Sequence, residues 1–89
     1  MEVKLIIPEY SKNSGIVSEW EHGFNIETSI QENVINITAN KEGLISLAKL
    51  LLFLAQDDVP NGAHVHYDEY NSLEEGSCEL IIEKGSGNS

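Results

Sequence analysis

The sequence predicts an α+β protein in which one long helix packs on one face of an antiparallel sheet of four to five strands, in the order β-β-β-α-β-β. Several segments alternate apolar and polar residues with the period of two that a strand requires. One continuous apolar run, residues 43–56, has the length and residue types of a helix. At 89 residues, the chain is long enough for one helix layer on one sheet but not for two cores.

Three strands are expected before the helix. Residues 2–7 alternate until Pro8, which lacks a backbone donor, so they predict a half-buried strand at or near a sheet edge. Residues 24–31 and 34–39 repeat the alternation, and the polar residues between them favour a tight hairpin. Around residues 16–20 the pattern allows either a short strand or a segment that packs over the sheet.

The helix is expected over residues 41–56. Asn40 is a suitable N-cap, and Glu42 places an acid in the first turn, where the helix dipole favours it. The apolar positions cover about 220° of the helical wheel, far more than the ~100° of an ordinary surface helix. Such a helix must be covered on more than one side, either by its own sheet and loops or by a partner chain. A homodimer is one expected consequence.

Two details conflict with this pattern. Phe53 falls in the polar sector of the wheel, beside Ser46 and Lys49. The acid pair Asp57-Asp58 follows the C-terminal end of the helix, where the helix dipole disfavours negative charge. Both details lie toward the acidic segment that follows the helix.

Two further strands follow the turn at Pro60. Residues 64–68 form the first, and residues 77–83 form the second, with Cys78 on its apolar side. The polar loop between them has Leu73 as its expected anchor. The domain is therefore expected to span residues 1–84, and the Gly- and Ser-rich residues 85–89 are expected to form a flexible C-terminal tail.

Composition narrows the possible partners. Five lysines, no arginine and fifteen acidic residues give a net charge of −10, which disfavours nucleic acid and anionic membranes and favours a basic protein surface. The apolar run is interrupted by Lys49 and is too short to span a bilayer. No secretory signal is recognisable, and the single cysteine fits a reducing compartment, so a cytoplasmic location is expected.

The chain lacks the residue patterns of an enzyme. No phosphate-binding glycine loop is present, and Cys78 is expected to be a small buried side chain rather than a nucleophile. His64 and His66 leave the same face of a strand and could share a metal ion, with only Glu79 or the distant His22 as a third ligand. A solvated or partner-facing histidine pair is favoured over a metal site, so no metal or cofactor is expected, and metal binding remains the alternative.

A protein-binding surface is the favoured interpretation of the segment after the helix. Eight of the fifteen acids lie between residues 57 and 83, interleaved with histidines and tyrosines. Charges steer an oppositely charged partner, and rings provide contact area. The expected partner-binding residues are Asp57, Asp58, His64, His66, Asp68, Glu69, Tyr70, Glu74, Glu75 and Glu79.

The same segment resembles a known family. The similarity begins at Asn40-Lys41-Glu42-Gly43-Leu44, and its most specific parts are Gly-x-His-x-His-x-Asp from Gly62 and Leu-Glu-x-Gly-Ser-x-Glu-Leu-Ile-Ile from Leu73. These motifs resemble immunity protein family thirty-two of bacterial polymorphic toxin systems. The resemblance covers roughly the C-terminal half, and His64, His66, Asp68, Gly76, Ser77 and Glu79 occupy family-like positions.

The resemblance implies a small cytoplasmic protein that binds and neutralises a cognate toxin domain delivered by sibling or rival cells. It agrees with the residue-level interpretation of a binding protein rather than a catalyst. A second alternative from the residues is a non-catalytic dimer with a regulatory or structural role.

Overall fold

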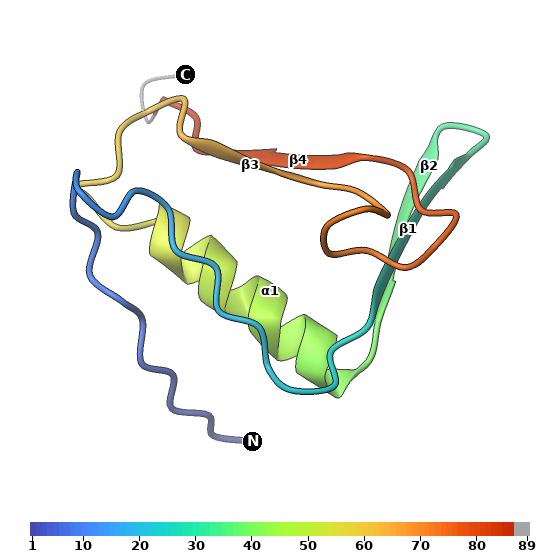
Figure 1. Ribbon diagram of the computed structural model, residues 1–89, viewed down its shortest axis with the longest axis horizontal. Helices are drawn as coiled ribbons and strands as arrows, with labels where there is room; N and C mark the ends of the chain where they lie inside the picture. The colour runs from blue at the N-terminus through green and yellow to red at the C-terminus, as the bar shows by residue number, and fades with distance from the viewer. Residues whose placement is uncertain (87–89) are drawn as a thin grey trace.

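The computed structural model describes residues 1–86 and confirms the α+β class with one helix. The elements follow the order β1 (Ile26–Gln31), β2 (Val34–Ala39), α1 (Lys41–Leu54), β3 (His64–Tyr67) and β4 (Leu80–Glu83). β1 pairs antiparallel with β2, and β3 pairs antiparallel with β4. Across the described residues these pairs form two separate two-stranded sheets, so the prediction of one sheet with four to five strands is wrong (Figure 1).

An irregular segment before β4 separates the two sheets. The backbone N–H of Glu74 donates to the carbonyl of Ile26 at 2.9 Å, and that of Cys78 donates to the carbonyl of Thr28 at 3.2 Å. Between these contacts the chain turns on itself, with the N–H of Ser77 bonded to the carbonyl of Glu74. The edge of β1 is therefore satisfied, but the turn interrupts any regular ladder that would join the sheets.

The strand expected at residues 2–7 is also absent, and the predicted strand order is corrected to β-β-α-β-β. Residues 16–20 do not form the short strand that was one of two expectations; Ile16, Val17 and Trp20 instead pack against the core. The Gln56 side chain instead holds this part of the chain against α1: its Nε2 donates to the carbonyl of Pro8 at 2.9 Å, and its Oε1 accepts from the N–H of Tyr10 at 3.0 Å. Within residues 2–7 only Ile7 packs against the core and Val3 is 49 % exposed, so the alternation in the sequence is not matched by burial.

The helix begins as predicted and ends two residues early, with Ala55 as its C-cap. The Oδ1 atom of Asn40 accepts from the N–H of Gly43 at 2.8 Å, which confirms the N-cap. No helix among residues 1–86 is both long enough and apolar enough to cross a membrane.

The buried side of α1 differs from the side that the wheel predicts. Phe53 and Ser46 are almost fully buried, whereas Leu44 and Leu51 are about half exposed. Residues 8–21 run along the helix and cover the sector that was expected to be polar (Figure 1). The hydroxyl of Ser46 accepts from the N–H of Glu21 and donates to the carbonyl of Glu42, both at 2.8 Å, so its burial leaves no polar group unsatisfied.

The core lies between α1, β1 and β3. It comprises Ile26, Leu50, Phe53, Leu54, Val59, Tyr67 and Leu73. Trp20 covers one side of this core, stacked on Phe24 with ring centroids 4.6 Å apart and in edge contact with Tyr67 at 5.1 Å. The burial of Leu73 confirms it as the anchor of the polar loop between β3 and β4.

The β1–β2 hairpin confirms the predicted tight turn. Gln31 pairs with Val34, which leaves a two-residue loop of Glu32 and Asn33, both with positive φ. Two successive positive φ values are typical of the type I′ turn, whose twist matches that of the flanking strands. Of the predicted tail, residues 87–89 lie outside the described residues.

Candidate binding surface

The outer face of the β3–β4 ribbon carries both histidines of the Gly-x-His-x-His-x-Asp motif. The strand register places His64 opposite Glu83 and His66 opposite Ile81. These four side chains are exposed, whereas Val65 and Ile82 are partly buried and pack against the core. The alternation of burial along both strands therefore sorts the ribbon into an apolar inner face and a polar outer face, as the sequence predicts.

Each histidine has an acidic neighbour on this face. The Nδ1 atom of His66 lies 3.4 Å from Oε2 of Glu79, and Nδ1 of His64 lies 4.0 Å from Oε1 of Glu83. The two imidazole rings are in edge contact with centroids 4.9 Å apart. The arrangement therefore offers carboxylate oxygens beside imidazole nitrogens, which together can contact basic and hydrogen-bonding groups on a partner.

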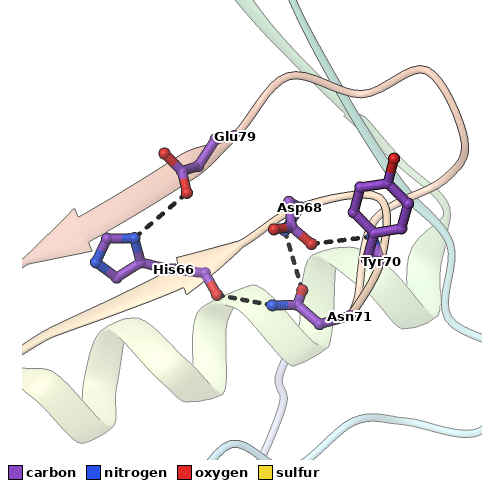
Figure 2. Close-up of polar contacts among 5 residues, drawn as sticks. All are labelled: His66, Asp68, Tyr70, Asn71 and Glu79. Atoms are coloured by element: carbon purple, nitrogen blue, oxygen red, sulfur yellow. Dashed lines mark hydrogen bonds and ion pairs between the residues drawn. The ribbon is translucent and has the colours of Figure 1, made fainter.

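The turn after β3 is ordered by Asp68 and Asn71. The Asp68 carboxylate accepts from the N–H of Tyr70 at 2.9 Å, and Asn71 Oδ1 accepts from the N–H of Asp68 at 3.0 Å (Figure 2). The Asn71 amide also donates to the carbonyl of His66 at 3.1 Å. This network leaves the Tyr70 ring 89 % exposed beside the ribbon, where a partner could cover it.

Two further acids in the loop make contacts that fix the backbone. Glu69 Oε2 accepts from the N–H of Gly76 at 2.8 Å, across the loop. Glu74 Oε1 accepts from the side-chain amide of Asn25 at 2.8 Å, which links the loop to the start of β1. Glu75 is exposed at the tip. Of the loop acids expected to bind a partner, Asp68, Glu69 and Glu74 thus also serve the loop's own structure.

Asp57 and Asp58 lie outside the ribbon and the loop that joins its strands. Both are exposed in the turn after α1, which meets the beginning of β3 (Figure 1). The loop of residues 68–76 lies at the other end of the same ribbon, near the hairpin (Figure 1). The ten expected residues therefore divide into one group of eight on the ribbon and its loop and one pair in the turn after α1. The carbonyl of Gln56, just before this pair, accepts from Nζ of Lys84, just after β4, at 2.6 Å.

Sequence reasoning missed three residues of this surface. Glu83 and Ile81 share the outer face with the histidines, and Asn71 orders the turn beneath Tyr70. The period of two along residues 77–83 could have added the first two. Asn71 lies three residues after Asp68, a spacing that suits a polar turn, but the bond to His66 depends on the tertiary structure.

The metal-binding alternative has no support in the geometry of the described residues. No group of three or more His, Cys, Asp and Glu side chains in residues 1–86 is arranged to hold a metal ion. His64 Nδ1 instead lies 2.8 Å from the carbonyl oxygen of Gly62, within hydrogen-bonding distance. Cys78 precedes β4 and is partly buried, with its Sγ atom 3.4 Å from Thr28 Oγ1.

Fold and surface together define a small α+β protein that presents acids and imidazoles on one face of a two-stranded ribbon and an exposed phenol on the adjoining loop. Comparison with known families gives a match to Immunity protein 32 over residues 34–85, more than half of the chain. The chain belongs to this family, and the resemblance seen in its motifs is confirmed. Searches of curated proteins and of solved structures each give no significant match.

Proposed function

We propose that the protein neutralises a cognate bacterial toxin in the cytoplasm by binding the toxin domain, without catalysis. The observation that carries this proposal is the family match, because the matched residues 34–85 include both strands of the ribbon and the whole loop between them. The family implies a toxin partner, and the ribbon together with its loop presents exposed acids, both histidines and the Tyr70 ring.

The proposed toxin-binding surface consists of the outer face of β3–β4 and the loop that joins them. His64, His66, Glu79 and Glu83 supply polar contacts on the ribbon, and Tyr70 and Glu75 supply a ring and a charge on the loop. A negative surface would steer a basic toxin face toward it, and the exposed ring could become an anchor once water is excluded. Asp57 and Asp58 are left out of this surface because they belong to the turn after α1 and not to the ribbon or its loop.

The test is protection in cells that co-express the chain and the toxin domain encoded beside its gene. We expect the wild-type chain to restore growth and to co-purify with the toxin. A Glu75→Lys/Glu79→Lys variant should lose protection, and Tyr70→Ala should weaken the complex roughly ten- to hundredfold, as loss of an aromatic anchor does.

The matched control is Glu2→Lys/Glu9→Lys, which changes the net charge equally at exposed positions far along the chain from the ribbon. This control should keep protection. Equal protection by both double variants would contradict the proposed surface, and a wild-type chain that neither protects nor binds the toxin would contradict the proposed function.

A further inference from the structure

One side of α1 carries an apolar stripe that the rest of the described chain leaves largely uncovered. Its members are Leu44, Ala48 and Leu51 of α1 and the C-cap residue Ala55, spaced by four, three and four residues, which is the spacing of the contact positions in paired helices. Leu44 is 56 % exposed and Leu51 is 51 % exposed. We call these four residues the outer stripe. Leu52 borders it and is 49 % exposed.

The outer stripe is complementary to itself when the helix direction is reversed. A two-fold axis between residues 49 and 50 places Leu44 opposite Ala55 of a second copy and Ala48 opposite Leu51. Each leucine then meets an alanine, so large and small side chains alternate along the contact and the two helices can approach closely.

Charges at the two ends of the stripe follow the same symmetry. Lys41 lies three residues before Leu44, and Asp58 lies three residues after Ala55; both are exposed. Asp58 lies in the turn beyond the C-cap Ala55, and antiparallel pairing about the same two-fold axis brings this turn to the Lys41 end of the second helix. The acids after α1 would then lie near the N-terminal end of the second helix, where the helix dipole favours negative charge.

We infer that α1 pairs antiparallel with α1 of a second copy through the outer stripe, flanked by two Lys41–Asp58 contacts. This pairing would cover the exposed apolar side of the helix. It would also place the acid pair after the helix near the N-terminal end of a second helix. It uses none of the residues proposed to bind the toxin, so it stands independently of the proposed function.

Sedimentation velocity of the full chain over ~1–100 µM, in ~0.15 M salt to screen long-range repulsion, tests the pairing. We expect a species with twice the mass of the chain. Leu51→Glu should raise the dimer Kd by about 100-fold or more, because the new charge would be buried in the contact. The matched control is Ile35→Glu on β2, which changes a residue 70 % exposed outside the stripe and should leave the Kd unchanged.

Exchange of the end charges tests the antiparallel register. Lys41→Asp and Asp58→Lys should each raise the Kd roughly two- to tenfold, by loss of an exposed ion pair and by repulsion. The double variant should restore the wild-type Kd. Circular dichroism of each variant checks that the helix is retained, and the charge series decides the question even if Leu51→Glu fails to fold.

Three results would overturn the inference. The first is a wild-type chain that is monomeric throughout this concentration range. The second is a dimer whose Kd does not rise with Leu51→Glu. The third is a double charge variant whose Kd stays as high as that of the single variants.

Discussion

Individual side chains determine how closely the elements of this protein approach one another. Gly43 is buried where α1 meets the hairpin, and a Cβ atom there would lie 2.5 Å from the carbonyl oxygen of Asn25 and 3.0 Å from Ala39 Cβ. Asn40 fixes the same junction, because its Oδ1 atom also accepts from the N–H of Asn25 at 3.0 Å and its amide donates to the carbonyl of Gly23. The residues at the start of the family-like segment thus hold the helix against β1.

Tyr67 gives the fold a dependence on alkaline pH. Burial raises the pKa of its phenol above the ordinary value, and the hydrogen bond with Ser18, 2.8 Å between hydroxyl oxygens, opposes this only in part. The folded state therefore keeps a proton that the unfolded state releases above about pH 10. The stability linked to Tyr67 is complete below that pH and decreases as the pH rises toward the folded-state pKa.

Tyr67→Phe tests this linkage by urea denaturation at several pH values. At pH 7 the variant should lose about 1 kcal/mol of unfolding free energy through the missing hydrogen bond. Between pH 9 and 11, as a rough range around the tyrosine pKa, it should lose less stability than the wild type. Tyr10 and Tyr70 are present in both proteins, so the difference isolates Tyr67. Parallel pH curves would contradict the prediction.

At the scale of elements, the hairpin and the helix were predicted well because local chemistry determines both. The Asn40 cap and the apolar run specify α1, and the short polar turn specifies the β1–β2 hairpin. The hairpin nevertheless has a non-optimal residue: Glu32 adopts φ 50°, a conformation that side chains other than Asn, Asp and Gly adopt at a cost.

Replacing the turn with Glu32→Asn/Asn33→Gly should stabilise the protein by about 1 kcal/mol, because Asn-Gly suits both positive φ values. Thermal and urea denaturation would measure the gain. As a control, Asn36→Gly in the middle of β2 should lower the unfolding free energy of the protein by roughly 0.5–1 kcal/mol. A loss of stability in the turn variant would show that the hairpin does not form the type I′ turn.

At the scale of the whole molecule, charge is the dominant feature. Fifteen acids oppose five lysines, and Lys49 is half-buried beside Glu19 and Glu21, with N–O distances of 3.9 and 3.8 Å. These contacts hold part of the N-terminal segment on α1. The remaining acids repel one another in the compact state more than in the unfolded chain.

Added salt should therefore stabilise the fold. Raising NaCl from ~0.02 to ~0.5 M should increase the unfolding free energy by about 1 kcal/mol through screening. Urea denaturation at fixed protein concentration measures this change, and KCl at equal ionic strength should give the same gain. The Glu2→Lys/Glu9→Lys variant should show a smaller gain. A fall in stability with salt would contradict self-repulsion as the cause.

The sequence alone determined the α+β class, the helix start, the hairpin and the two faces of the ribbon, because each depends on residues close together in the chain. It also indicated the family, because the two motifs of the family are short and contiguous. Only the tertiary structure decided that the sheet divides in two and that residues 2–7 form no strand. It also decided which side of α1 is buried. A helical wheel gives only the positions of apolar residues around the helix. In the structure the backbone of residues 8–21 hydrogen-bonds to Ser46 and Gln56 and covers that side of the helix, and Leu44 and Leu51 on another side stay exposed.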